Sequence, residues 1–259
     1  MTDSLFWAID IKNQFHHNWM GMSQINQTTS GNFYSHRNIT DQVLENFTDA
    51  LDCLTAHLML ECSEVLAGVK PANLISIVNR TRPCGRNLYL LWQQHHTDLA
   101  QRLNNLNFMV LQSRQQSLLL LCYDHVRLEH HLSHPGIRTL LHKAGYKDDA
   151  DCEGMLLELR SRIGGNNSFP HEIGLFIGYP AKDVAAFMGL VRLPFTCQRL
   201  WKIYGNPARS LALAEQYRCC RNKMGAILAR GTSKTLEIDR SDHPFFCQTD
   251  ENDYQYLPC

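Results

Sequence analysis

Two short apolar runs separated by a polar turn constrain the fold of this chain more than any other feature. Residues 108–111 and 117–123 are almost entirely apolar, and residues 113–116 between them are polar. Such a pattern is typical of a β-hairpin. A third run, residues 73–78, predicts a buried strand, and the apolar spacing over residues 86–103 predicts a helix that crosses between that strand and the hairpin. We therefore expect a small mixed sheet.

The rest of the chain shows helical spacing. Over residues 40–62 the apolar positions share one face, which predicts a single helix that begins at Thr40 and ends near Cys62. After residue 124 the pattern is mainly helical, with one further short strand expected at 201–204. The predicted helices cover residues 135–145, 151–163, 181–191 and 207–230. The predicted fold class is therefore α+β, with a small mixed sheet covered by helices and a helix-rich C-terminal half.

Length and composition predict one domain between two polar ends. A chain of 259 residues with 44% hydrophobic residues can bury a substantial core. Residues 1–39 are polar and lack a clear period, so we expect an irregular N-terminal extension. Residues 40–230 are expected to form the single α+β domain, and residues 231–259 a polar C-terminal tail.

Charge and cysteine usage narrow the class of protein. Lys and Arg together number 25, as do Asp and Glu, so no overall positive charge favours nucleic acid, and no nucleic-acid partner is expected. The longest apolar run, residues 118–123, is too short for a membrane span. Ten cysteines without a C-x-x-C motif or a secretory signal predict a cytosolic protein with reduced thiols.

The stretch from Ser168 to Pro180 suggests a candidate site. Ser168 is a natural N-cap, so His171 and Glu172 are expected in the first turn of a short apolar helix. The positive end of a helix dipole favours a neutral imidazole, which can ligate a metal or accept a proton. The alternative is structural: Glu172 complements the dipole and His171 bonds a neighbouring loop.

A second candidate site lies before the first predicted strand. Cys62 and Lys70 flank the turn into that strand, and a thiol near a lysine can act as a nucleophile or a soft ligand. The alternatives are a buried, inert thiol and a lysine that lies at the surface or contacts an anion. Asn73 in the strand and Tyr179 in the second motif complete the candidate ligand-binding residues.

No metal site, cofactor or catalytic residue is assigned from sequence. His130 and His134 are four residues apart, but the Leu-Ser-His-Pro break at 132–135 is expected to separate two helices there, so a solvated surface is the favoured interpretation. Signatures of phosphate-binding loops, dinucleotide binding, serine hydrolysis and zinc ribbons are absent.

Three stretches together resemble a bacterial family known as domain of unknown function 3793. They are Cys62 through Leu74, His171 through Pro180 with Asp183-Val184, and Trp201 through Gly205 followed by the helix that carries Tyr217-Arg218. The chain departs from the family pattern at Ser63-Glu64 and Asp124-His125. The resemblance implies a bacterial source, mainly anaerobic, and gives slight weight to an iron-linked function, but it carries no assigned activity.

Three hypotheses about function remain open. The leading one is a cytosolic binding or accessory protein that holds a small ligand or a metal-containing cofactor near His171, Glu172 and the first strand. The second is an enzyme that uses Cys62 as a nucleophile or His171 as an acid or base. The third is a protein–protein adaptor whose helices 181–191 and 207–230 form the contact surface.

Overall fold

The computed structural model describes residues 39–165, 169–231 and 236. Along the chain the elements are α2 (Ile39–Glu45), α3 (Ala50–Glu61), α4 (Ser63–Leu66), β1 (Ala72–Val78), α5 (Leu88–Arg102), β2 (Asn107–Arg114), β3 (Ser117–Tyr123), α6 (His125–Ser133), α7 (Pro135–Lys143), α8 (Cys152–Gly164), α9 (Ile173–Phe176), α10 (Ala181–Phe187), β4 (Phe195–Gln198), β5 (Lys202–Tyr204) and α11 (Ala208–Leu228). Nearly all of the expected extension and tail lies outside these ranges. None of the helices described combines the length and apolarity needed to cross a membrane.

The α+β class is confirmed, but the main sheet is antiparallel rather than mixed. Its strand order is β1-β3-β2, and both neighbouring pairs are antiparallel. The predicted hairpin forms β2 and β3, and α5 crosses from β1 to β2 as expected. Because β3 takes the central place, β1 and β2 run in the same direction without pairing. A small second sheet pairs β4 with β5, of which only β5 was predicted.

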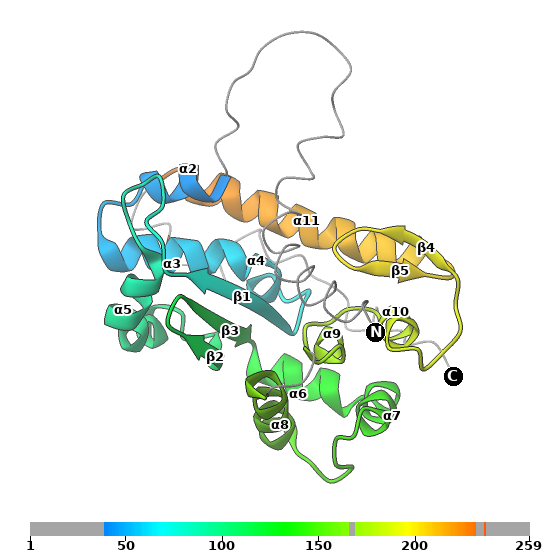
Figure 1. Ribbon diagram of the computed structural model, residues 1–259. Helices are drawn as coiled ribbons and strands as arrows, with labels where there is room; N and C mark the ends of the chain where they lie inside the picture. Colours follow the sequence, from blue (N-terminus) through cyan, green and yellow to red (C-terminus); the bar gives the residue numbers. More distant parts are fainter. Residues whose placement is uncertain (1–38, 166–168, 232–235, 237–259) are drawn as a thin grey trace, which may run out of the picture.

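The sheet separates two hydrophobic cores, so the domain has three layers (Figure 1). Along β3, Leu118 and Leu120 face the core that α3, α5 and α11 complete. Leu121 faces the opposite core, which α6, α8 and α9 cover. This alternation follows from the two-residue period of a strand. Strand β3 is therefore apolar on both faces, which explains its nearly continuous run of leucines.

The prediction of a single helix over residues 40–62 is wrong, because the chain forms two helices there. Helix α2 ends at Glu45, and Asp49 then caps α3 by accepting a hydrogen bond from the backbone N–H of Asp52 at 2.9 Å. An aspartate at this position satisfies an N–H that would otherwise lack a partner. The apolar spacing continues across the break because both helices pack on the same core.

A buried carboxylate joins three segments of the C-terminal half. Asp183, on α10, accepts hydrogen bonds from the indole N–H of Trp201 at 2.9 Å and the hydroxyl of Ser210 at 2.6 Å. It also accepts one from the backbone N–H of Tyr204 at 2.9 Å. The side chain is 1% exposed and forms an ion pair with Lys182 at 2.6 Å. These bonds fix the β4–β5 hairpin and the start of α11 on α10.

The turn between α9 and α10 lies directly against the start of β1. Gly178 has a φ of +77°, a left-handed conformation that other residues adopt only with strain. A Cβ atom at this position would also lie 2.6 Å from Cδ of Pro71. Glycine is therefore required here for two independent reasons, and the close approach places the next residue, Tyr179, beside the beginning of the sheet.

Replacing Gly178 with alanine is expected to destabilise the protein more than the same change at Gly189. Gly189 has a φ of +74° with open space around its Cα, so Gly189→Ala is expected to cost only the backbone strain, about 1–2 kcal/mol. Gly178→Ala adds the overlap with Pro71 and should lower the free energy of unfolding by at least about 1 kcal/mol more. Urea denaturation measures both, and equal losses would contradict the close approach.

Candidate functional site

The connection from α3 to β1 folds back on itself and brings Lys70 next to Glu64. Cys62 terminates α3, and the one-turn helix α4 follows immediately. Gly68 then takes a left-handed conformation, with a φ of +74°. The backbone N–H groups of Val69 and Lys70 donate to the carbonyl oxygen of Glu64 at 3.0 and 3.2 Å. The seven residues between Cys62 and Lys70 therefore form a compact loop rather than an extended linker.

The ammonium group of Lys70 is buried among polar and aromatic side chains. Its Nζ donates a hydrogen bond to Oδ1 of Asn73 at 2.6 Å. It also lies 5.5 Å from the centre of the Tyr179 ring and 5.2 Å from that of Tyr217, within the range of cation–π attraction. Lys70 is only 5% exposed, and burial lowers its pKa. We call Cys62, Glu64, Lys70, Asn73, Tyr179 and Tyr217 the Lys70 group.

Two tyrosines from distant parts of the chain complete this group. Tyr179 follows Gly178 in the turn described above, and its ring stacks on Trp201 at a centroid distance of 4.6 Å. Tyr217 comes from the middle of α11, and its hydroxyl donates to the carbonyl oxygen of Gly178 at 3.0 Å. Tyr179 is partly exposed, whereas Tyr217 is buried. Tyr179 is therefore the more exposed of the two tyrosines beside Lys70.

Glu64 is the least satisfied member of the Lys70 group. Its carboxylate is buried, and no described residue forms a hydrogen bond with Oε2. The hydroxyl of the neighbouring Ser63 is also buried without a partner among the described residues. Burial raises the pKa of Glu64, although the positive charge of Lys70 opposes this effect. An acidic group and an amine thus share a dry environment without forming a direct ion pair.

The thiol of Cys62 is an unfavourable nucleophile in this setting. It is completely buried and interacts with the thiol of Cys122 on β3, which lies opposite Asn73 in the sheet register. Burial raises the pKa of Cys62 well above its ordinary value, and the contact with Cys122 raises it further. Because the reactive form is the thiolate, these surroundings suppress reactivity at neutral pH.

An ordinary ion pair lies one turn before the Lys70 group and provides a useful comparison. Arg221 of α11 binds Oε1 of Glu61 at 2.7 Å. Burial alone would raise the pKa of Glu61, but Arg221 outweighs it and the pKa falls to about 2. Glu61 is therefore a satisfied, ionised carboxylate, whereas Oε2 of Glu64, three residues later, has no hydrogen-bond partner among the described residues.

His171 and Glu172 lie away from the Lys70 group and face different partners. The expected helix is shorter than predicted: α9 begins at Ile173, with Glu172 at its N-cap and His171 in the preceding turn, while Ser168 lies outside the described residues. Glu172 accepts hydrogen bonds from Arg162 at 3.0 Å and from the Tyr146 hydroxyl at 3.3 Å. The ring of His171 packs edge-on against Phe187 at 5.0 Å. No described contact joins either residue to Lys70.

The histidine-rich segment forms two helices, as predicted. His134 separates α6 from α7 and accepts a hydrogen bond from the backbone N–H of Gly136 at 3.1 Å. The ring of His131 is within 2.8 Å of the carbonyl oxygen of Leu175. Over the described part of the chain, no three His, Cys, Asp or Glu side chains come together in a way that could hold a metal ion.

Sequence reasoning selected four members of the Lys70 group and missed two. Cys62, Lys70, Asn73 and Tyr179 were candidates, and the structure brings them together. Glu64 was noted only as a departure from the family pattern. Tyr217 belongs to α11, where it and Arg221 are four residues apart and share one helix face. That spacing is the signal that could have linked α11 to this site.

The thiols are expected to differ strongly in reactivity. Cys219 is exposed on α11, whereas Cys62 is buried. At pH 7.5 we expect N-ethylmaleimide to modify Cys62 on the order of 100-fold more slowly than Cys219, because modification of Cys62 requires local opening. Peptide mass spectrometry of timed samples measures both rates in the folded protein. Modification of Cys62 as fast as Cys219 would contradict this and favour a thiol-dependent enzyme.

Comparison with known proteins identifies the family. A family model described as "Protein of unknown function (DUF3793)" matches residues 58–236, which is more than half of the chain and includes the entire Lys70 group. No curated protein and no solved structure matches the chain. The matched region begins in α3 and extends beyond α11, so it contains the main sheet and the core covered by α6, α8 and α9, whereas the other core also includes residues of α2 and the first half of α3. The chain therefore belongs to the protein family of unknown function DUF3793.

Proposed function

We propose that this protein is a cytosolic binding protein that holds a small polar ligand at the Lys70 group. One observation carries the proposal: a buried lysine and a buried glutamate lie close together, and Oε2 of the glutamate has no hydrogen-bond partner among the described residues. Burying ionisable groups costs several kcal/mol per ion, on the order of the stability of a domain, unless partners compensate. Uncompensated groups of this kind cluster at functional sites.

The chemistry of the group indicates the kind of ligand. Lys70 offers N–H donors, Glu64 offers an acceptor or, when protonated, a donor, and the Ser63 hydroxyl offers both. A molecule with an acceptor at one end and a donor at the other would satisfy Lys70 and Glu64 together. The partly exposed ring of Tyr179 is the side chain that would move to admit it. Ten cysteines without a C-x-x-C motif support a reducing compartment.

His171 and Glu172 have a structural role in this proposal. Glu172 already has two hydrogen-bond partners, and the guanidinium of Arg162 stacks over the Tyr146 ring at 4.1 Å. A carboxylate with an arginine and a tyrosine as partners needs no ligand to compensate its burial. Strand β1 therefore remains part of the proposed site. The segment from Ser168 to Pro180 contributes Tyr179 to this site rather than His171 and Glu172.

Without its ligand, the buried Glu64 is expected to lower the free energy of unfolding of the protein. The substitutions Glu64→Gln and Glu61→Gln test this. In extensively dialysed protein at pH 7, Glu64→Gln should raise the free energy of unfolding by about 1 kcal/mol, because the buried acid with its raised pKa no longer has to ionise. Glu61→Gln is the matched control. It should lower that free energy by about 1–3 kcal/mol, because the depressed pKa of Glu61 makes its ionised form stabilising above pH 4.5. Urea denaturation measures both, and a loss of stability in Glu64→Gln would contradict the expected cost.

The ligand itself is sought in protein purified anaerobically. Small molecules released from wild-type protein, Glu64→Gln and Glu61→Gln are compared by mass spectrometry, and metals by elemental analysis. We expect a polar compound that is reduced about tenfold or more in Glu64→Gln and retained in Glu61→Gln, because only the first change removes a charged hydrogen-bond partner of the ligand. A compound retained equally by both variants, or none in the wild-type protein, contradicts the proposal. A stoichiometric metal lost only in Glu64→Gln would instead support a metal-containing cofactor.

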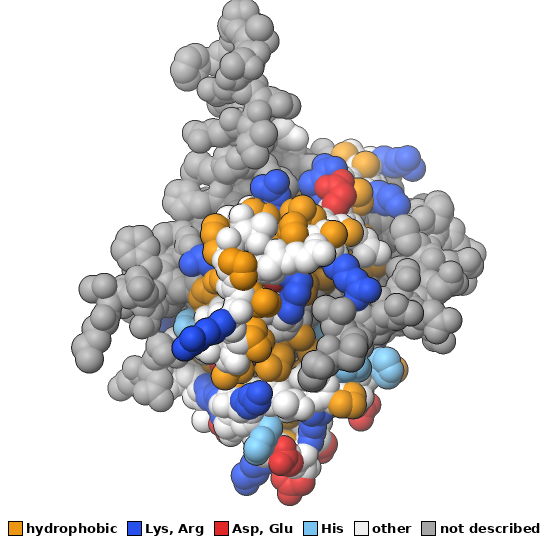
Figure 2. All heavy atoms as spheres, turned by 90° about the vertical axis from the view of Figure 1, so that its right-hand side faces the viewer, with side chains coloured by type: hydrophobic (Ala, Val, Ile, Leu, Met, Phe, Trp, Pro, Cys, Tyr) orange, Lys and Arg blue, Asp and Glu red, His pale blue; other side chains and the backbone are white. Residues whose placement is uncertain are grey.

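A protein–protein adaptor is the second candidate, and one surface favours it. Val191 and Leu193, between α10 and β4, and Phe195, the first residue of β4, are 41%, 38% and 57% exposed. Figure 2 shows hydrophobic side chains interspersed with Lys and Arg on this side of the molecule. Exposed apolar side chains that lie together indicate a contact surface. Loss of a protein complex in Phe195→Ser, with the bound small molecule unchanged, would support this function separately.

A further inference from the structure

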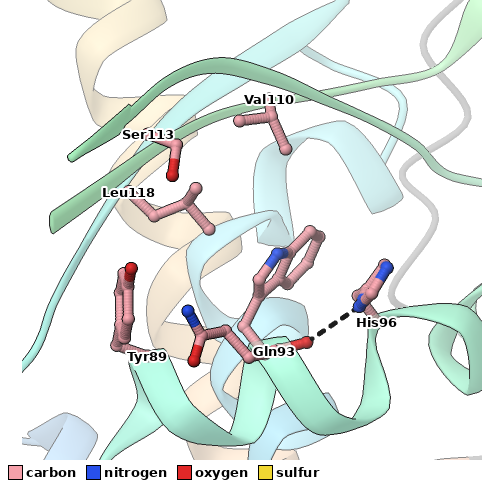
Figure 3. A pocket seen from close by; sticks show the side chains of 7 residues that line it. Tyr89, Gln93, His96, Val110, Ser113 and Leu118 are labelled. Carbon is pink, nitrogen blue, oxygen red and sulfur yellow. Dashed lines mark hydrogen bonds between the residues drawn. The ribbon is translucent and has the colours of Figure 1, made fainter. Parts of the chain in front are cut away.

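A groove separate from the Lys70 group lies between α5 and the main sheet. Its volume is about 230 Å³. Its walls are formed by α5 on one side and by β2 and β3 on the other (Figure 3). We call the following residues the α5 groove: Tyr89, Trp92, Gln93, His96, Val110, Ser113 and Leu118.

A β-bulge in β2 directs a polar side chain into this groove. Val110 lies opposite Leu120 and Ser113 lies opposite Leu118, while the register shifts at Leu111 between them. Leu118 and Leu120 share one face of β3, so Val110 and Ser113 share that face as well. Without the extra residue, positions three apart would point to opposite faces. Bulges commonly redirect side chains in this way beside functional sites.

The helical wall of the groove is aromatic and held in place. Trp92 and His96, one turn apart on α5, stack at a centroid distance of 5.8 Å with an angle of 25° between their planes. Phe108 packs edge-on against Trp92 at 5.7 Å. The Tyr89 hydroxyl donates to the carbonyl oxygen of Arg114 at 3.3 Å, which ties α5 to the end of β2. These contacts hold the aromatic side chains of α5 in place beside the strands.

Three polar groups border this apolar space. Nδ1 of His96 is 3.1 Å from the carbonyl oxygen of Trp92. A carbonyl can only accept, so Nδ1 carries the hydrogen and Nε2 is an acceptor in the neutral ring. In Figure 3 the Gln93 amide reaches toward the strands and the Ser113 hydroxyl toward α5, and neither is hydrogen-bonded to another residue drawn. Among the described residues, the lining contains no Asp, Glu, Lys or Arg side chain.

We propose that the α5 groove binds a small, neutral, planar heteroaromatic molecule of one or two fused rings. An apolar cavity of about 150 Å³ accommodates a benzene ring, so the larger α5 groove has space for a bicyclic compound. The aromatic side chains of Tyr89, Trp92 and His96 in the lining favour a planar ligand through ring contacts. The amide of Gln93 and the hydroxyl of Ser113 would hydrogen-bond a ring nitrogen and a ring N–H. The absence of charge from the lining disfavours phosphates and carboxylates.

Benzimidazole is a suitable probe because it is planar and carries one ring N–H and one ring acceptor. Ligand-observed NMR with the full-length chain at pH 7.5 is expected to show saturable binding with a Kd of about 1 mM or tighter. Cyclohexanol, which is similar in apolar character but not planar, should bind at least about tenfold more weakly. Absence of saturable benzimidazole binding, or equal binding of cyclohexanol, would overturn the proposal.

Substitutions in and beside the α5 groove test whether benzimidazole binds there. Gln93→Leu keeps the side-chain size but removes the amide, and should weaken benzimidazole binding about fivefold to tenfold. Gln94→Leu makes the same change one residue later, at an exposed position outside the groove, and should leave binding unchanged. Ser113→Phe fills the groove and should abolish binding while circular dichroism shows a folded protein. Unchanged binding in folded Ser113→Phe would place benzimidazole elsewhere and overturn the assignment.

Discussion

The C-terminal half of the structure depends on the hydrogen bonds that the buried carboxylate of Asp183 accepts. It accepts hydrogen bonds from Trp201, Ser210 and the backbone of Tyr204, so three segments that are separate in sequence meet at one side chain. Hydrogen bonds to a charged acceptor are stronger than neutral ones, and burial leaves no water to replace them. Because Trp201 in turn stacks on Tyr179, Asp183 also helps to position a ring that lies beside Lys70.

Buried charge has two different roles in this fold. Glu172 and Glu61 each bind an arginine, and the energy of the ion pair compensates the cost of burial. Glu64 lies beside Lys70 without such a bond to its Oε2. A fold that pairs Glu172 and the partly buried Glu61 with arginines, but leaves Oε2 of the buried Glu64 without a partner among the described residues, has kept an energetically unfavourable arrangement at one place. That contrast within one chain is the physical basis of the proposal that Glu64 contacts a ligand.

Local patterns in the sequence predicted much of the fold. The hairpin, α5, β1 and α11 follow from apolar spacing and turn residues, which act over a few positions. The break between α2 and α3 was missed because one apolar face runs through both helices. Pairing between strands is a property of the whole sheet, so the antiparallel order could not be derived from the strands alone. The short strand β4 is mostly exposed and carries little apolar signal.

The candidate site was predictable only in part, for the same reason. Cys62, Lys70 and Asn73 are close in sequence, so the loop that joins them keeps them together. Glu64 is a candidate because its Oε2 is buried without a hydrogen-bond partner among the described residues, and a sequence pattern cannot show this. The α5 groove was not foreseen, since Ser113 shares a face with Val110 only through the register shift at Leu111. A relative that lacked this residue would keep the same three strands, and its serine, then two positions after the valine, would still face α5; what it would lose is the buried leucine that the bulge adds to the core beneath α8.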